Sequence, residues 1–245
     1  MISDRMASVL RTLQLDDRSQ GVDDATLAGA QALGVDGLAV SLATAANLTE
    51  LMWCSDLTTR RFEDLQLTLG EGPGPEAVRT GAMVWVPDLA RVRHARWPAL
   101  SMEAPDLDAR AVFCFPMGIG AIRVGVLTAV RRTPGPLTGQ QTDDALTLAA
   151  ALAARCLGSG EPPLGTHAPV DSPHALQHAV VHQATGMLSV QLSLPLPQAL
   201  LRLRAHAYSS GRSITDISKD VVDRRLRLDH NGTGNGTPPT AVDKD

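Results

Sequence analysis

The chain has 245 residues and a formal net charge of −4, and 44% of its residues are hydrophobic while only 3% are aromatic. This composition predicts a packed core of Leu, Val and Ala and excludes a uniformly basic nucleic-acid-binding protein. No run approaches the ~18 apolar residues of a membrane span, and no apolar segment follows a basic start. Three widely spaced cysteines suit neither a disulfide framework nor a zinc site. We therefore expect a soluble, cytoplasmic protein with free thiols.

Helices and strands alternate in the first part of the chain. Apolar periodicity predicts helices at 23–33, 57–69 and 138–157. Alternating apolar runs predict strands at 37–43 and 50–55, one strand within 81–89 and two within 110–132. Gly70 ends the second helix, Thr138 or Thr142 caps the third, and the last two strands turn near Gly118 and Gly120. Hairpins with helices at both ends indicate an α+β domain with an antiparallel sheet.

Two stretches rich in Gly, Pro and small polar residues divide the chain. Residues 158–173 (GSGEPPLGTHAPVDSP) have the composition of a linker, and residues 229–245 have that of a disordered tail. We therefore expect a larger unit at 23–157, preceded by a helical segment at 1–22, and a compact unit at 174–228.

Three motifs in the larger unit carry a family resemblance. They are LGEGPGPEAVRTGAMVWVPDL at 69–89, RWPAL at 96–100 and RAVFCFPMGIGAIRVGVLTAVRR at 110–132. Together they resemble the GAF domain of actinobacterial GAF–ANTAR regulators over about residues 25–157. The resemblance implies a GAF-like antiparallel sheet flanked by helices, with a pocket for an unidentified small molecule. Gly74 stands where many relatives carry a cysteine.

Residues 174–228 predict an all-α unit of three short helices. On the first helix, the expected buried face consists of Leu176, Val180, Ala184, Met187, Leu188 and Gln191. Gly186 lies at the margin of this face, and because glycine costs roughly 1 kcal/mol relative to alanine, we expect another backbone to approach it closely. The second helix begins near Pro197, and the third begins at a capping box of Ser213 and Asp216. Their expected buried residues are Leu200, Leu203, Ala207, Ile214, Ile217 and Val221.

The stretch QATGMLSVQLSLPLPQALLRLRAHAYSSGRSITDISKDVV at 183–222 carries a second resemblance. It resembles the ANTAR domain, a three-helix RNA-binding module of transcription antiterminators. The matching positions are Ala184, Gly186, Met187, Leu188, Ala199, Leu203, Arg204, Ala207, Ile214 and Ile217. Three positions depart from the pattern: Thr185 replaces a lysine, Gln191 replaces an arginine, and Pro195–Pro197 replaces a capping Ser or Asp.

This resemblance implies that the unit binds nascent RNA hairpins. Residues 170–228 carry six Arg and one Lys against four Asp, which supplies cations for an RNA backbone. These cations are Arg202, Arg204, Arg212, Lys219, Arg224, Arg225 and Arg227. The RNA-binding residues that we expect are Thr185, Gly186, Ser189, Arg204, Arg212 and Ser213. Thr185→Lys is expected to strengthen RNA binding because it restores a cation of the family.

The resemblance also implies a homodimer, because ANTAR regulators bind paired hairpins. The part of the long helix at 142–157 offers an apolar stripe, which suits either a dimer interface or packing on the sheet. The stripe consists of Leu146, Ala149, Ala150, Ala153 and Leu157.

Histidines at every fourth position form a stripe on the first helix of the compact unit. They are His174, His178 and His182, and Thr185 and Ser189 continue the stripe. A solvated face is the expected role. A metal site and a gain of charge on mild acidification are the alternatives.

Two other functions stay open beside RNA binding. Residues 213–228 resemble the second half of a DNA-binding helix-turn-helix, and a unit that has lost RNA binding would act as an interaction module. An enzyme is not expected, nor a cofactor or a metal. Some GAF proteins are thiol-dependent methionine sulfoxide reductases, but Cys54 and Cys114 lie in apolar strand patterns, where thiols are normally inert.

Overall fold

The computed structural model describes residues 1–15, 19–43, 49–120, 122–158 and 175–228. The chain divides into two compact units, Met1–Ala175 and Leu176–Asp245, which we name unit 1 and unit 2. The expected linker at 158–173, apart from Gly158, lies outside the described residues, as do the expected tail at 229–245 and His174.

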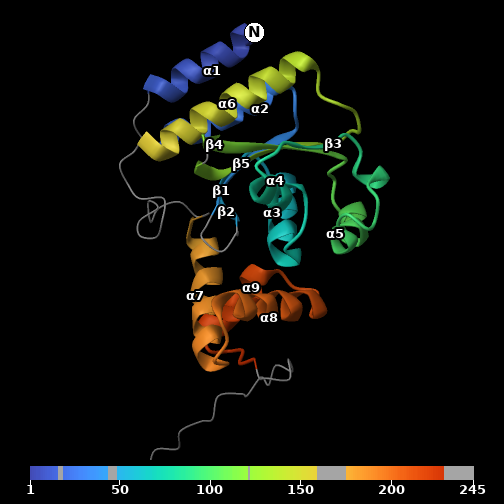
Figure 1. Ribbon diagram of the computed structural model, residues 1–245, viewed down its shortest axis with the longest axis vertical. Coiled ribbons are helices and arrows are strands. Elements are labelled where there is room, and N and C mark those ends of the chain that lie inside the picture. Colours follow the sequence, from blue (N-terminus) through green and yellow to red (C-terminus); the bar gives the residue numbers. More distant parts are fainter. Residues whose placement is uncertain (16–18, 44–48, 121, 159–174, 229–245) are drawn as a thin grey trace, which may run out of the picture. The chain divides into compact units, whose positions relative to one another are not determined.

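Unit 1 is built on one antiparallel sheet of five strands in the order β2-β1-β5-β4-β3 (Figure 1). The strands are β1 (Gly37–Ala43), β2 (Thr49–Cys54), β3 (Val84–Val86), β4 (Ala111–Ile119) and β5 (Ile122–Arg131). The predicted hairpins β1–β2 and β4–β5 both form, and the second turns at Gly120, whose φ is 60°. The prediction of an α+β domain with an antiparallel sheet is confirmed.

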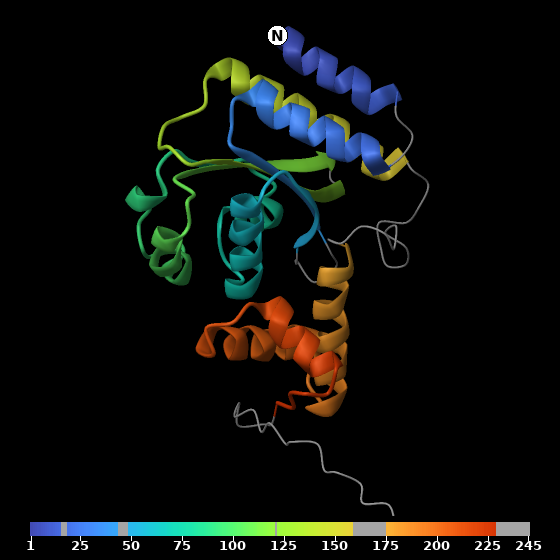
Figure 2. The same ribbon diagram turned by 180° about the vertical axis from the view of Figure 1, so that it is seen from behind.

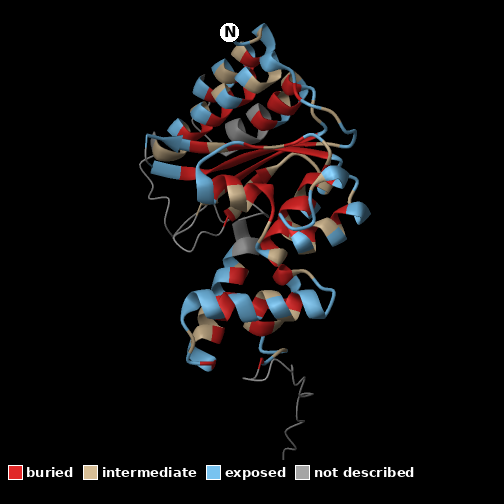
Figure 3. Cartoon of the chain, turned by 45° about the vertical axis from the view of Figure 1, so that its right-hand side comes forward, coloured by how far each residue is buried: buried red, intermediate tan, exposed pale blue. Residues whose placement is uncertain are grey.

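Helices cover both faces of this sheet (Figures 1 and 2). One face carries α1 (Asp4–Leu15), α2 (Ser19–Leu33) and α6 (Gly139–Gly158), and the other carries α3 (Leu57–Leu69), α4 (Pro73–Thr80) and α5 (Pro98–Glu103). Each face has its own buried core, seen as the red segments between helices and sheet in Figure 3. Met6, Val9 and Leu13 of α1 lie in the same core as Leu38 and Phe113, so the N-terminal helix packs as part of unit 1.

Local signals set several helix ends in unit 1. Asp56 caps α3, because the Thr59 backbone N–H donates to its Oδ1 at 3.0 Å, and Gly70 ends that helix with φ 72°. Thr138 caps α6, because the Gln141 N–H donates to its Oγ1 at 3.2 Å. The helix predicted to begin at residue 23 begins instead at Ser19.

The apolar stripe on α6 is divided between core and surface. Ala149 and Ala153 are buried in the core against the sheet, whereas Leu146 and Ala150 are exposed. The centre of the stripe therefore packs on the sheet, although the sequence also allowed it to form a dimer interface. Only its outer margin remains at the surface of unit 1.

Unit 2 contains α7 (Ala175–Gln191), α8 (Leu196–Ser209) and α9 (Ile214–Val222). Every buried position expected on α8 and α9 is buried: Leu200, Leu203, Ala207, Ile214, Ile217 and Val221. The buried face expected on α7 is wrong in part. Val180 and Met187 are only half-buried and Gln191 is exposed, while Val181 and Thr185 are buried beside the expected Ala184 and Leu188. Apolar residues lie on nearly all sides of α7, so its pattern cannot select one face.

All three helices of unit 2 end in the same backbone motif. In each, the residue after the C-cap has a positive φ: 50° at Ser193, 63° at Gly211 and 59° at Arg224. The following N–H reaches back to the helix, from Leu194 to Ser189 O, from Arg212 to Ala207 O and from Arg225 to Asp220 O. This is the Schellman arrangement, whose left-handed position favours glycine. Only α8 has a glycine there.

Candidate functional site

Thr185 does not face the solvent. Its side chain is 6% exposed, and its hydroxyl donates to the Val181 carbonyl at 2.7 Å within α7. His182 on the same expected stripe is exposed, so the stripe is not one solvated face. A lysine at position 185 would place a charge in a buried site, which makes Thr185→Lys a destabilising change rather than a clean test of RNA binding.

Gly186 is not closely approached by another backbone, contrary to the expectation from sequence. A Cβ added there meets no atom within 4 Å. The residue is half-buried and has an ordinary helical conformation. The surface beside Gly186 is therefore open within unit 2.

Two serines that were predicted to bind RNA form hydrogen bonds with the backbone of unit 2. The Ser189 hydroxyl donates to the Leu194 carbonyl at 2.6 Å, across the turn that follows α7. Ser213 caps α9, because its Oγ accepts from the Asp216 N–H at 3.1 Å and donates to the Asp216 carboxylate at 2.8 Å. The predicted cap at Ser213 is confirmed, and both serine hydroxyls are engaged in hydrogen bonds within unit 2.

The two predicted arginines differ in environment. Arg204 is half-buried, and burial lowers its pKa, although a guanidinium stays charged in proteins. Arg212 is exposed and forms an ion pair with Asp220, with 2.8 Å between Nη2 and Oδ2. Removal of Arg204 therefore disturbs packing as well as charge.

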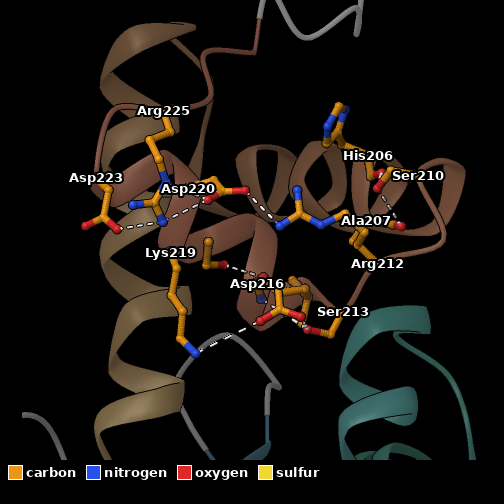
Figure 4. A network of polar contacts seen from close by, with 12 residues as sticks. His206, Ala207, Ser210, Arg212, Ser213, Asp216, Lys219, Asp220, Asp223 and Arg225 are labelled. Carbon is orange, nitrogen blue, oxygen red and sulfur yellow. Dashed lines mark hydrogen bonds and ion pairs between the residues drawn. The ribbon is translucent and has the colours of Figure 1, made fainter. Parts of the chain in front are cut away.

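Asp220 joins two arginines in the network drawn in Figure 4. Its Oδ2 accepts from Arg212, and its Oδ1 accepts from Arg225 Nε at 2.9 Å. Arg225 also pairs with Asp223 at 2.8 Å. The hydrogen bond from Arg212, followed by that from Arg225, lowers the pKa of Asp220, so the carboxylate is ionised at neutral pH. The Asp220 carboxylate thus accepts hydrogen bonds from two guanidinium groups, in the way that a phosphate group also can.

Sequence reasoning did not identify this role of Asp220. The sequence indicates at most a pair of Asp220 with the nearby Arg225. Arg212 lies before α9, and only the turn brings it to Asp220.

The other cations of unit 2 differ in their partners. Lys219 Nζ lies 4.0 Å from Asp216 Oδ1. Three other exposed arginines form no ion pair within the part of the chain that the structure describes: Arg202, Arg224 and Arg227.

In unit 1, the motifs that resemble the GAF family tie the chain together. Glu76 of α4 accepts from Arg96 at 2.6 and 3.1 Å and from the Trp97 indole at 3.0 Å. The hydrogen bonds from Arg96 lower the pKa of Glu76. Glu71 accepts from the Leu100 N–H at 2.9 Å. The two glutamates therefore hold α4 and the loop before it against the Arg-Trp-Pro segment.

A row of buried polar groups lies under α3. The Ser41 hydroxyl on β1 donates to Glu63 at 3.2 Å, Gln66 donates to the same carboxylate at 3.3 Å, and the Gly74 N–H donates to Gln66 at 2.8 Å. A cysteine side chain at position 74 would press on Gln66, because an added Cβ lies 3.2 Å from Gln66 Oε1. Glycine at this position keeps the row intact.

Burial raises the pKa of all three thiols. The pKa of Cys54 rises to about 11, that of Cys114 rises well above its ordinary value, and that of Cys156 also rises. Among the described residues, no three His, Cys, Asp or Glu side chains gather to hold a metal ion. Across the same residues, no helix has the length and apolar character that a membrane crossing needs.

Comparison with known proteins identifies the fold of unit 1. The chain is similar to the GAF domain from Acinetobacter phosphoenolpyruvate-protein phosphotransferase, with a TM-score of 0.51, 16% identity and coverage of 63% of this chain and 91% of that one. It is similar in the same way to the GAF domain of a phosphoenolpyruvate-protein phosphotransferase from Coxiella burnetii, with a TM-score of 0.51, 19% identity and coverage of 63% and 95%. No protein-family model matches the chain, and no curated protein matches it either. The five-stranded sheet with its flanking helices has the fold of a GAF domain.

Proposed function

We propose that this protein is a cytoplasmic transcription regulator in which the GAF-fold unit receives a small-molecule signal and unit 2 is an ANTAR-type bundle that binds nascent RNA hairpins. The observation that carries the proposal is the division of charge. The described residues of unit 2 hold seven Arg and Lys against three Asp, whereas residues 1–175 hold 14 Arg against 20 Asp and Glu. Six of the seven cations are exposed, which suits a phosphate backbone.

Arg224 supports this role for unit 2. It occupies the left-handed position after α9, where φ is 59° and where a glycine is most stable. A cation kept in a strained backbone position favours a role outside folding. Phosphate binding is the role that fits a guanidinium at an exposed helix end.

The buried positions of unit 2 support the ANTAR resemblance. Seven of the matching apolar residues are buried, namely Ala184, Leu188, Ala199, Leu203, Ala207, Ile214 and Ile217, and Met187 is half-buried. The family pattern therefore falls on the core of the unit, where it specifies packing. Phosphate contact would fall to the exposed arginines, which partly replace the cations missing at Thr185 and Gln191.

The thiols support a role without catalysis in unit 1. A thiol-dependent reductase needs a thiolate at neutral pH, and burial raises the pKa of each cysteine away from that range. We propose no cofactor. The action on paired hairpins requires a homodimer, for which the exposed margin of α6 at Leu146 and Ala150 is available.

The proposal is tested with the full chain and an RNA of two hairpins, by measuring affinity across a salt series. Replacement of Arg202, Arg224 and Arg227 by Gln is expected to weaken binding by about tenfold or more and to reduce the log–log salt slope by about 2. The control replaces three exposed arginines of unit 1, Arg5, Arg11 and Arg61, by Gln. This control has the same net charge and is expected to bind RNA like the parent protein.

Three outcomes would contradict the proposal. Equal weakening by both triple variants would mean that only net charge matters. Tighter binding to duplex DNA than to RNA at equal salt would favour the helix-turn-helix alternative. Binding of neither nucleic acid would leave unit 2 as an interaction module.

A further inference from the structure

A surface pocket of about 940 Å³ lies beside the edge strand β3 of unit 1. Three segments line it: the end of β3 with the residues that follow, the arginine-rich turn 91–96, and the loop 134–136. Its volume falls within the range of small-molecule sites in proteins. Glu71 and Glu76 are not among its lining residues.

The walls of the pocket are held in place without a ligand. Pro87, Pro134 and Pro136 contribute rings of fixed φ. The Gly135 N–H donates to the Pro87 carbonyl at 2.8 Å, and Arg131 Nη1 donates to the Pro136 carbonyl at 3.2 Å. Because these walls are already ordered, binding of a ligand costs little conformational entropy of the protein.

Trp85 provides an aromatic wall. Its ring packs edge-on against Phe113 of the core, with 4.7 Å between centroids and 65° between planes, which fixes its orientation. Trp85 as a whole is only half-buried, and it is one of the residues that line the pocket. An aromatic ring of a ligand can pack against it.

The charge of the pocket is positive. Arg91, Arg93 and Arg96 line it, and Asp88 is the one carboxylate among the lining residues. Asp88 is already engaged, at 3.3 Å from Arg91 and 3.5 Å from Arg110. Arg93 is exposed and forms no ion pair within the described ranges of the chain. It is the cation that an incoming anion can bind without displacing a carboxylate.

We propose that this pocket binds small aromatic anions, with the ligand's phosphate or carboxylate at Arg93 and its ring against Trp85. The inference rests on the sensor half of the proposed function and names the chemistry of its signal. It does not depend on RNA, so a binding measurement on the protein alone separates its failure from that of RNA binding.

The test uses phenyl phosphate and the full-length protein, followed through the indole N–H resonances of its three tryptophans. Trp85→Phe assigns the Trp85 resonance. We expect phenyl phosphate to shift that resonance saturably and to leave Trp53, on the opposite edge strand β2, unchanged. Arg93→Gln is expected to weaken binding by about fivefold, whereas the exposed Arg61→Gln on α3 leaves it unchanged.

Further ligands separate the sources of the anion and the need for a ring. Benzoate tests a carboxylate in place of the phosphate, inorganic phosphate lacks the ring and phenol lacks the charge. Both aryl anions are expected to bind more tightly than phosphate or phenol. The proposal is overturned by the absence of a saturable shift at Trp85, by equal affinities of Arg93→Gln and Arg61→Gln, or by phenol binding as tightly as phenyl phosphate.

Discussion

Asp220 is the residue at which the proposed RNA binding of unit 2 can be tested through its arginines. Its carboxylate occupies Arg212 and Arg225 at once, each within 2.9 Å. Asp220→Asn keeps the shape of the side chain and removes its charge, so Arg212 loses its ion pair and Arg225 keeps only its pair with Asp223. We expect RNA affinity to rise by about threefold to tenfold, measured by fluorescence anisotropy at fixed salt.

The matched control for this prediction is Asp108→Asn in unit 1. Asp108 forms a comparable surface ion pair with Arg132 at 3.4 Å. Its replacement makes the same change in net charge and is expected to leave RNA affinity close to that of the parent. An unchanged affinity of Asp220→Asn would show that Arg212 and Arg225 do not face RNA.

Gly186 offers a second test at the residue scale. Because an added Cβ meets nothing within 4 Å, Gly186→Ala is expected to stabilise unit 2 by about 0.5–1 kcal/mol through helix propensity. If RNA contacts the surface beside α7, the same methyl group lowers RNA affinity. Urea unfolding and RNA titration measure the two effects separately. A loss of stability instead would mean that another segment approaches Gly186.

At the scale of elements, the Glu76 contacts join α4 to the Arg-Trp-Pro segment. Hydrogen bonds from Arg96 hold the pKa of Glu76 below its ordinary value of 4.5. The stabilisation is therefore present above pH 4.5 and is lost as the pH falls through the lower folded-state pKa. Glu76→Gln is expected to reduce the free energy of unfolding by about 1–2 kcal/mol at neutral pH.

Urea unfolding at neutral pH and at several acidic pH values checks this linkage. The difference between Glu76→Gln and the parent should shrink as the pH falls below 4.5, because the unfolded carboxyl takes up a proton first and the folded carboxyl only below its lowered pKa. Glu103→Gln in α5 is the control, since Glu103 makes no ion pair within the described residues. A difference that stays constant with pH would assign the effect to packing rather than to charge.

The ends of α8 and α9 form a natural pair for a second element-scale test. Both use the Schellman motif, with Gly211 after one helix and Arg224 after the other. Arg224→Gly is expected to raise the free energy of unfolding by about 0.5–1 kcal/mol and to weaken RNA binding. Gly211→Ala is expected to lower the free energy of unfolding by about 1 kcal/mol. A destabilising Arg224→Gly would show that the Arg224 side chain contributes to the fold.

At the scale of the whole molecule, the composition of residues 158–173 predicts where the chain can be cut. The stretch contains no Lys or Arg, so subtilisin rather than trypsin is the suitable protease. We expect the first cleavage there, with release of a stable fragment of unit 1. Mass spectrometry of early time points identifies the cut. Simultaneous loss of both units would contradict independent folding.

The sequence by itself determined the features that depend on neighbouring residues. The strand at Gly37–Ala43, the helix end at Gly70 and the cap at Ser213 follow from turn, capping and alternation signals a few residues long. The buried faces of α8 and α9 were also predictable, because each helix has one clear apolar side.

Only the tertiary structure decided the features that depend on distant residues. The strand order β2-β1-β5-β4-β3, the burial of Ala149 and Ala153 on α6 and the choice of the Thr185 side of α7 all depend on what packs against each element. At the site, even a pair only eight residues apart depends on the folded structure, because the turn before α9 brings Arg212 to Asp220. Periodicity shows which residues can be buried, but the partner that buries or neutralises them is set by contacts between segments far apart in the chain.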